Sequence, residues 1–349
     1  MSRLAVVLFN LGGPDRSESV QAFLFNLFYD PAIIGAPKPV RWLLASLIAA
    51  RRAPKAAAIY GKLGGGSPLL RLTREQADVL EARLGSGAKV FIAMRYWHPL
   101  SDETAEAVKA FDPERIVLLP LYPQYSTTTT ESSLKDWRRA ARAAGLAAPT
   151  VAVCCYPIDA GLVTAHARLI RAAMAEAAQA GKPRILFSAH GLPKKVIARG
   201  DPYQWQVEQT ATAIVCALGS PGLDWVVCYQ SRVGPLEWIG PAIGDEIKRA
   251  AADRVPVVVV PVAFVSEHSE TLVELDIDYR HRAEALGVPA YVRVPALGVA
   301  AEFIDGLARL VQDAAKAPAG ACRAPGGRLC PQAFSRCAIV SEVTDRSER

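Results

Sequence analysis

The stretch from Pro256 to Tyr279 limits what this chain can fold into more than any other. It opens with four consecutive valines, Val257 to Val260, and a run that is apolar on both faces is typical of a strand buried in a parallel sheet. A helical pattern follows this strand. It carries four carboxylates, namely Glu267, Glu270, Glu274 and Asp278. At about 100° per residue, these four side chains are expected on one narrow stripe of a helix.

The acidic stripe has two interpretations. A line of charges most often marks a helix face in contact with solvent. Here apolar residues flank the stripe on both sides, namely Leu272, Leu275 and Tyr279 on one side and Val273 and Ile277 on the other. That arrangement favours a helix that lines a cleft. His268 lies among the same carboxylates, and a histidine beside carboxylates after a strand suits metal or proton chemistry.

Strand and helix patterns alternate along the rest of the chain. The segments expected to form strands are 4–9, 89–95, 115–121, 150–155, 184–188, 225–229, 257–260 and 290–294. Amphipathic helical patterns separate them, and one is expected to run from Thr73, a candidate N-cap, to Leu84. Alternation with short connections predicts parallel sheets that helices cover on both faces.

The alternation restarts near the middle of the chain. This predicts an α/β protein of two Rossmann-like, doubly wound halves with a cleft between them. The first half is expected at residues 1–155, completed by a closing helix at 300–315, and the second half at residues 156–299. Residues 316–349 are expected to form a C-terminal tail.

Several classes of ligand and location are disfavoured by the sequence. The turn after the first strand, NLGGP from Asn10 to Pro14, lacks the G-x-G-x-x-G spacing of a dinucleotide site, so no nucleotide is expected. A net charge of +6 over 349 residues is too weak to indicate nucleic acid. The first residues do not resemble an export signal, and the apolar run Trp42–Ala50 is too short to span a membrane. We therefore expect a cytoplasmic protein.

The segment from Ser17 to Gly64 holds two helical patterns rich in large apolar residues, with the basic run Arg51 to Lys55 near its end. Two interpretations are open. The helices either pack within the first half, or residues 17–50 form an apolar lip over a flat ligand and contact a membrane.

His190 is a second candidate for chemistry, because it follows the strand expected at residues 184–188. A lone histidine is more often a structural residue than a functional one. Parallel strands of one sheet end at the same edge, however, so His190 and Glu270 could meet there. That placement strengthens the functional interpretation.

Several long segments of the sequence resemble one known family. They are LFNLGGPD, YGKLGGGSPL, RYWHPL, LYPQYS, FSAHGLPKKVIARGDPY, CYQSRVGPLEWIGP and PVAFVSEHSETLVELDIDYR, and the resemblance runs from residue 4 to about residue 310. The family is the ferrochelatases, lyases that insert Fe²⁺ into protoporphyrin IX in the last step of haem synthesis and release two protons. The resemblance implies two Rossmann-like halves around a porphyrin cleft. It leaves open a chelatase for coproporphyrin or another metal, and an inactive porphyrin carrier.

The resemblance also implies roles for individual residues. His190 and Glu270 match the catalytic pair, and each could take a pyrrole proton or hold the metal, so the order of roles stays open. The implied path for metal or protons adds Glu267, His268, Glu274 and Asp278. The implied porphyrin contacts are Leu11, Arg51, Arg52, Tyr60, Ser67, Arg95, Tyr96 and Trp238. Arginine suits the porphyrin propionates because a guanidinium binds a carboxylate through two parallel hydrogen bonds.

A flat, apolar porphyrin makes the lip interpretation of residues 17–50 more favourable, because apolar walls bind it and a membrane can supply it. We therefore expect peripheral contact with the inner membrane through this segment.

Three cysteines lie in the tail, Cys322, Cys330 and Cys337. Some ferrochelatases hold a [2Fe–2S] cluster with C-terminal cysteines and one from the body, so the resemblance implies a cluster with Cys154 or Cys155 as fourth ligand. The tail spacing differs from that of the animal-type proteins, and Thr127 to Thr130 occupy the loop where their fourth ligand lies. A zinc site and incidental thiols are the other interpretations.

Overall fold

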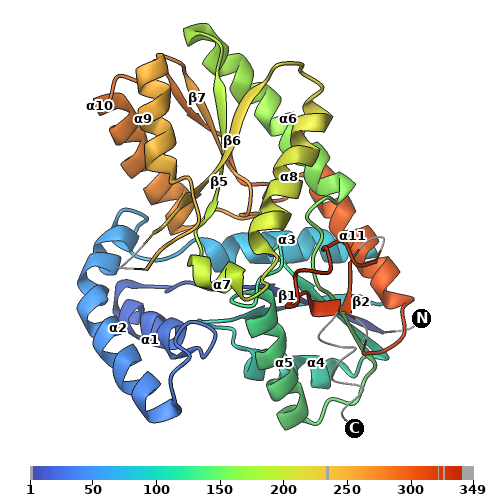
Figure 1. Cartoon of the computed structure of the whole chain (residues 1–349). Helices are drawn as coiled ribbons and strands as arrows, with labels where there is room; N and C mark the ends of the chain where they lie inside the picture. The colour runs from blue at the N-terminus through green and yellow to red at the C-terminus, as the bar shows by residue number, and fades with distance from the viewer. Residues whose placement is uncertain (1–2, 233–235, 321, 325–326, 340–349) are drawn as a thin grey trace. The chain divides into compact units, whose positions relative to one another are not determined.

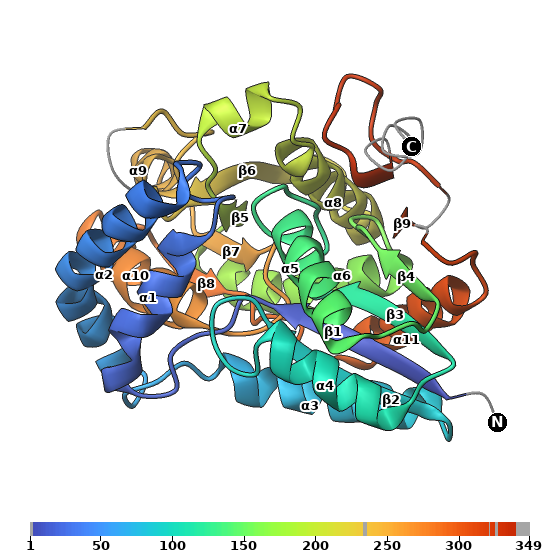
Figure 2. The ribbon, with the colours of Figure 1, turned by 90° about the horizontal axis from the view of Figure 1, so that it is seen from below.

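The computed structural model describes residues 3–232, 236–320, 322–324 and 327–339 (Figure 1, Figure 2). The chain divides into two compact units. Unit 1 comprises residues 1–155, 307–329 and 338–349, and unit 2 comprises residues 156–306 and 330–337. None of the helices in the described ranges combines the length and apolar character needed to cross a membrane.

The sheet of unit 1 has the strand order β2-β1-β3-β4-β9 within the described residues, and every neighbouring pair is parallel. Its strands are β1 (Leu4–Asn10), β2 (Ala88–Met94), β3 (Arg115–Pro120), β4 (Thr150–Val153) and β9 (Cys322–Arg323). Helices α4 (Ser101–Phe111) and α5 (Thr130–Ala144) contribute apolar side chains to one core with alternate residues of β1, such as Val7 and Phe9. Trp137 of α5 meets Phe9 edge to face there, with ring centroids 6.0 Å apart. This period of two is what a strand with helices on both faces requires.

Unit 1 also contains a pair of helices, α1 (Val20–Tyr29), preceded by the short 3₁₀ turn η1 (Ser17–Ser19), and α2 (Lys38–Gly61), both drawn in blue in Figure 1. Phe23 and Leu24 of α1 and Ala49 of α2 share an apolar cluster with Tyr60 and Tyr96. The two helices therefore pack within unit 1 through one face, while α2 leaves another face exposed.

Helix α3 (Leu69–Leu84) begins one turn before the expected N-cap. The prediction that Thr73 caps this helix was wrong. Thr73 lies inside the helix, where its hydroxyl donates to the carbonyl oxygen of Leu69 at 2.7 Å. A threonine in a helix can satisfy its hydroxyl in this way, so its presence alone does not mark a helix start.

The sheet of unit 2 has the order β6-β5-β7-β8 and is also parallel throughout the described residues. Its strands are β5 (Arg184–His190), β6 (Asp224–Gln230), β7 (Val257–Pro261) and β8 (Tyr291–Arg293). Val258 and Val260 pack with α6 (Ala160–Ala177) and α8 (Tyr203–Leu218). Val257 and Val259 pack with α9 (Ile243–Asp253) and α10 (Arg280–Ala285) on the other face. The four valines thus serve both faces, and the predicted α/β class with parallel sheets is confirmed.

The remaining elements of this part of the chain are the short helices η2 (Ala178–Ala180) and α7 (Lys194–Ala198) and the closing helix α11 (Ala301–Ala315). The helix after β7 is not an α-helix. Residues Glu270–Tyr279 form a π-helix, η3. Because π-helices are rare, mostly single-turn and often found at functional sites, a π-helix of ten residues as the next element after β7 marks this edge of the sheet as a candidate functional site.

The C-terminal residues differ from the single tail expected at 316–349. Cys322 and Arg323 form β9, which pairs with Ala152 and Val153 of β4. Residues 330–337 belong instead to unit 2, where the Arg336 N–H donates to the Gly200 carbonyl oxygen at 3.2 Å. Residues 340–349 lie outside the described part of the chain. A strand of two residues is too short to leave a recognisable sequence pattern.

Candidate functional site

His190 is the last residue of β5, and strand pairing fixes the position of its backbone. It pairs in register with Gln230, the last residue of β6. Tyr203 of α8 donates its hydroxyl to the His190 carbonyl oxygen at 3.1 Å. A Cβ atom on the following Gly191 would come within 3.0 Å of the Gln230 carbonyl oxygen and 3.3 Å of Trp238, so a larger residue there would crowd the backbone at the end of β6. Trp238 therefore lies beside the residue that follows His190.

Glu270 is the first residue of the π-helix, and His268 holds the turn before it. The backbone N–H of Glu270 donates to His268 Nδ1 at 3.0 Å, and the His268 N–H donates to the Thr271 hydroxyl at 3.0 Å. Burial lowers the pKa of His268, although Glu270 and Glu267 act in the opposite direction. Because Nδ1 accepts a hydrogen bond, the nitrogen of His268 that remains for other partners is Nε2.

The imidazole and the carboxylate of the expected pair face each other. His190 Nδ1 lies 2.8 Å from Glu270 Oε2, and the two side chains are 39% and 29% exposed. Burial disfavours the imidazolium, but the Glu270 carboxylate outweighs it and raises the pKa of His190. Burial likewise opposes the charge of Glu270, yet His190, His268 and Ser231 lower its pKa to about 2. Both directions favour an imidazolium hydrogen-bonded to a carboxylate, in a place that solvent reaches.

Glu274 lies one turn further along the π-helix, and two residues without an expected role hold it. The Ser231 N–H donates to Glu274 Oε1 at 2.9 Å, and the Ser231 hydroxyl donates to Oε2. The side-chain amide of Gln230 lies 3.3 Å from Oε2. Burial and the neighbouring Glu270 raise the pKa of Glu274. Sequence reasoning missed Gln230 and Ser231, although both stand directly after a predicted strand, where polar residues collect.

The four-carboxylate stripe does not form as expected, because the helix begins only at Glu270. Glu267 lies before it, and its Oε1 accepts from the Arg293 guanidinium and from the Ala296 N–H. The Arg293 guanidinium also donates to the Asp276 carboxylate. Asp278 is exposed. The structure thus brings Glu270 and Glu274 together with His190, and it directs Glu267 to a buried arginine.

Two expected porphyrin contacts of unit 1, Arg95 and Tyr96, follow strand β2 and are bound to a buried aspartate. Arg95 Nη2 lies 2.9 Å from Asp30 Oδ2, and the Tyr96 hydroxyl donates to the same oxygen at 2.9 Å. Ser132 donates to it as well. Burial and the Asp30 charge raise the pKa of Tyr96 well above its usual value.

The other expected porphyrin contacts of unit 1 fall into two settings. Leu11 and Tyr60 belong to the apolar cluster of α1 and α2. Ser67 directly follows Gly64 to Gly66. A Cβ atom on Gly13 would come within 2.6 Å of the Ser67 hydroxyl, so this close approach depends on a glycine at position 13. Arg51 and Arg52 are exposed on α2, with the Arg52 guanidinium over the ring of Phe28 at 5.4 Å. These two cations are accessible to an acidic ligand.

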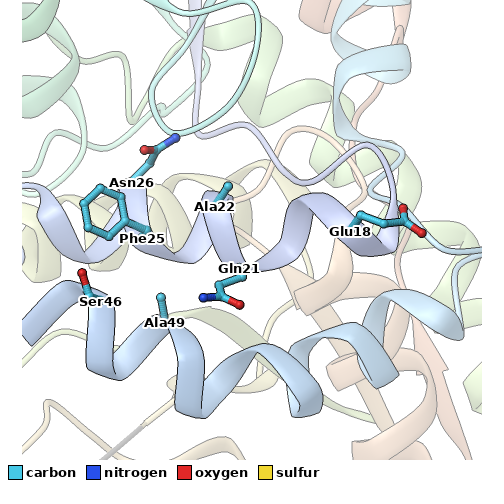
Figure 3. Close-up of a pocket in the computed structure, with 7 residues that line it drawn as sticks. All are labelled: Glu18, Gln21, Ala22, Phe25, Asn26, Ser46 and Ala49. Carbon is cyan, nitrogen blue, oxygen red and sulfur yellow. The ribbon is translucent and has the colours of Figure 1, made fainter.

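A groove of about 470 Å³ lies between α1 and α2 (Figure 3). Its lining comprises Glu18, Gln21, Ala22, Phe25, Asn26, Ser46 and Ala49. None of the expected porphyrin contacts is among these residues. The groove is therefore separate from the residues that the family resemblance points to.

The cysteines of the body and of β9 lie together in unit 1. Cys154 Sγ and Cys155 Sγ are 3.8 Å apart, and Cys322 belongs to the same buried cluster. Cys330 and Cys337 belong to unit 2, where Gln206 Nε2 lies 3.1 Å from Cys330 Sγ. Among the residues that the structure describes, no three His, Cys, Asp or Glu side chains form a group that could hold a metal ion.

Comparison with solved structures defines the class of the fold. SirB from Bacillus subtilis with Fe³⁺ gives a TM-score of 0.52 at 13% identity, covering 90% of this chain and 96% of that chain. The sirohydrochlorin chelatase SirB from Bacillus subtilis subspecies spizizenii in complex with cobalt gives a TM-score of 0.51 at 13% identity over the same shares of both chains. The chain thus has the fold of the chelatases.

Sequence comparison then defines the family. The ferrochelatase family model matches residues 3–315. The ferrochelatase of Caulobacter vibrioides (strain NA1000 / CB15N) is 56% identical over 341 residues, which cover 96% of this chain and 97% of that protein. The ferrochelatase of Phenylobacterium zucineum (strain HLK1) is 54% identical over 341 residues, covering 96% and 98%. The chain belongs to the ferrochelatase family.

Proposed function

We propose that this protein inserts Fe²⁺ into protoporphyrin IX to give protohaem, with release of two protons. The observation that carries the proposal is the 2.8 Å contact between His190 Nδ1 and Glu270 Oε2 at a partly exposed edge of the unit 2 sheet. Family membership supports it, because the sequence match spans nearly the whole chain.

Metal insertion requires a group that takes protons from the pyrrole nitrogens and groups that bring Fe²⁺ to the ring. Solvent reaches the pair of His190 and Glu270, so the His190 imidazolium can release its proton there, and the neutral imidazole can then accept a proton from a pyrrole nitrogen. Imidazole nitrogen and carboxylate oxygen are also both ligands that Fe²⁺ accepts. Glu274 adds a second carboxylate next to Glu270, which suits a path for the metal or for the departing protons. Asp278 and the Nε2 atom of His268 extend this set.

The proposal assigns recognition of the porphyrin to residues of unit 1 and to Trp238 of unit 2. Arg51 and Arg52 are exposed cations, and a guanidinium binds a propionate with two parallel hydrogen bonds. The Ser67 hydroxyl can add a neutral hydrogen bond, and Leu11 can offer apolar surface, with Tyr60 packed in the same cluster. Arg95 and Tyr96 support the same region through their contacts with Asp30.

An assay of Fe²⁺ insertion into protoporphyrin IX and into coproporphyrin, followed by loss of porphyrin fluorescence, tests the proposal. We expect faster insertion into protoporphyrin IX. A preference for coproporphyrin would make coproporphyrin the substrate in place of protoporphyrin IX. Binding of porphyrin without any insertion would indicate a carrier. Zn²⁺ and Co²⁺ in parallel reactions test whether Fe²⁺ is the preferred metal.

We also propose that the exposed face of α2 contacts the membrane peripherally, on the inner membrane's cytoplasmic side. Apolar residues at positions 40, 43, 44 and 47 share one helix face, on which Leu47 is 60% exposed, and Trp42 beside them is 55% exposed. Arg51 continues the face with a positive charge, which anionic lipids attract. The membrane could deliver the poorly soluble porphyrin.

Sedimentation with phosphatidylglycerol vesicles tests the contact. We expect the wild type to sediment with the vesicles and Leu47→Glu to stay in the supernatant. Leu286→Glu is the matched control, because Leu286 is also an exposed leucine but lies on unit 2. Equal sedimentation of the two variants would count against the proposal.

We further propose a [2Fe–2S] cluster on Cys322, Cys330, Cys337 and either Cys154 or Cys155. The position of β9 supports it, because this strand brings Cys322 beside the cysteines that follow β4. Within the described residues the thiols do not form a complete ligand set. Visible absorption and labile sulfide in the purified protein would support the cluster. Bound zinc without labile sulfide would indicate a zinc site instead.

A further inference from the structure

Ser231 combines an unusual backbone conformation with contacts to both carboxylates of the candidate site. It follows β6 and has a φ of 61°, in the left-handed region that few residues other than glycine adopt. In this conformation its N–H donates to Glu274 Oε1 at 2.9 Å. Its hydroxyl binds Glu274 Oε2 and lies 3.3 Å from Glu270 Oε2. The serine therefore touches both carboxylates from one position.

The neighbouring Gln230 fixes the same arrangement from the sheet. Gln230 is fully buried, and its Oε1 accepts from the Ser188 hydroxyl at 2.7 Å. Its Nε2 must then face the other way, where it lies 3.3 Å from both the Glu270 carbonyl oxygen and Glu274 Oε2. Strand β6 thus ends in two consecutive residues that hold the start of the π-helix.

This geometry matters because Glu270 and Glu274 carry like charges at close range, and neighbouring carboxylates turn away from each other unless donors hold them. A divalent cation, by contrast, binds best to ligands that are already in place, since ordering them on binding has an entropic cost. A hydroxyl between the two carboxylates provides such ordering without adding a positive charge that would repel the metal.

We propose that Ser231 is a positioning residue for metal insertion, whose hydroxyl holds Glu270 and Glu274 as one ordered pair of ligands for a divalent cation. The inference rests on the proposed function for its role in turnover, but the ordering of the two carboxylates can be measured with metal alone.

The backbone and the hydroxyl of Ser231 can be separated by two substitutions. Ser231→Ala removes the hydroxyl and keeps a side chain that is strained at positive φ. Ser231→Gly removes the hydroxyl and favours that φ. If the hydroxyl matters, both variants weaken metal binding to a similar extent. If only the backbone conformation matters, Ser231→Gly behaves as the wild type.

The first measurement is a titration of the porphyrin-free protein with Co²⁺, followed by the visible absorption of the bound ion. We expect the dissociation constant to rise roughly 10- to 100-fold in both variants, as for loss of a hydrogen bond to a charged group. In Glu274→Ala, the further change Ser231→Ala is expected to have a smaller effect than in the wild type, because the Ser231 hydroxyl then holds only Glu270. Equal Co²⁺ affinity in the wild type and both Ser231 variants, or full additivity with Glu274→Ala, would overturn the proposal.

The second measurement is the steady-state rate with Fe²⁺ and protoporphyrin IX. We expect the KM for Fe²⁺ to rise in both variants, while kcat and the KM for the porphyrin change much less. A uniform loss of kcat with unchanged KM for Fe²⁺ would contradict the inference. If the wild type binds Co²⁺ in a Ser231-dependent way but inserts no iron, the ordering role stands and the proposed function fails. The two failures are therefore distinguishable.

Discussion

Two groups of paired charges, one in each unit, lie near the carboxyl ends of parallel strands. The Asp30 group consists of Arg95 and Tyr96, which follow strand β2 of unit 1, with Asp30 after α1 and Ser132 of α5. The Glu270 group consists of His190 at the end of β5, Ser231 after β6, and Glu270 and Glu274 of the π-helix that follows β7. Each has a carboxylate that accepts hydrogen bonds from a nitrogen base and a serine.

The difference lies in the base and in the access of solvent. Asp30 and Arg95 are 2% and 17% exposed, and a guanidinium stays protonated at any ordinary pH, so this ion pair has one state. His190 and Glu270 are more exposed, and imidazole gains and loses its proton near neutral pH. The same arrangement of carboxylate and base therefore stabilises the fold in unit 1 and remains able to exchange protons in unit 2.

The largest effect predicted from this contrast is a loss of Fe²⁺ insertion rate on substitution of Glu270. We expect Glu270→Gln to lower the rate of Fe²⁺ insertion by about 10²- to 10⁴-fold, the range for loss of a proton-transferring group. The amide still accepts a hydrogen bond from His190, so the urea midpoint should change little. Glu302→Gln is the control, because Glu302 is a carboxylate on unit 2 whose partner is the exposed Arg168. A variant that unfolds but keeps its rate per folded molecule would reverse the assignment.

The second effect is on stability. Asp30→Ala leaves the Arg95 guanidinium and the Tyr96 hydroxyl without their shared acceptor, and breaking a buried ion pair costs about 3–5 kcal/mol of unfolding free energy. We expect urea unfolding to show this loss, with a smaller loss for Asp30→Asn. Asp112→Ala serves as the control, because Asp112 pairs with Arg3 at an exposed position. A normal midpoint combined with lost turnover would place the Asp30 group in the chemistry.

The sequence could predict much of the Glu270 group and little of the Asp30 group. Four valines identified a buried strand, and β5 and β7 are neighbours in the sheet, so residues after both strands meet at one edge. Asp30, by contrast, meets Tyr96 and Ser132 across 66 and 102 residues of chain. No local pattern reports such a contact.

The π-helix and Ser231 were beyond sequence reasoning for a related reason. The four-residue interval between Glu270 and Glu274 fits an α-helix as well as a π-helix, so the periodicity of the sequence did not distinguish the two. It also did not reveal that the helix starts only at Glu270 and that Glu267 pairs with Arg293. Positive φ at a serine has no sequence signal, because glycine and asparagine are the residues that indicate it. Long-range contacts decide both features.

A third buried base sharpens the comparison, because it has no carboxylate at all. His166 of α6 is fully buried, and neither ring nitrogen has a hydrogen-bond partner among the described residues. Burial lowers its pKa from 6.5 to about 4. His190, which faces Glu270, shifts in the opposite direction. The direction of the pKa shift of an imidazole thus depends on its partner, since burial alone lowers the pKa of His166 and a carboxylate raises the pKa of His190.

The sign of the resulting pH dependence follows from these directions. As the pH falls below 6.5, the unfolded chain protonates His166 while the folded protein does not until about pH 4, so stability is lost through this window. Between about pH 7.5 and pH 5, this difference in protonation lowers the free energy of unfolding by roughly 2 kcal/mol.

We expect His166→Leu to remove this part of the pH dependence of urea unfolding and to leave the rest, since leucine suits an apolar site of similar size. His281→Leu, at an exposed position of α10, should keep the wild-type dependence. If His166→Leu also kept the wild-type pH dependence, the His166 imidazole would have nearly the same pKa in the folded protein as in the unfolded chain. Burial without a partner would then not lower the pKa of this histidine.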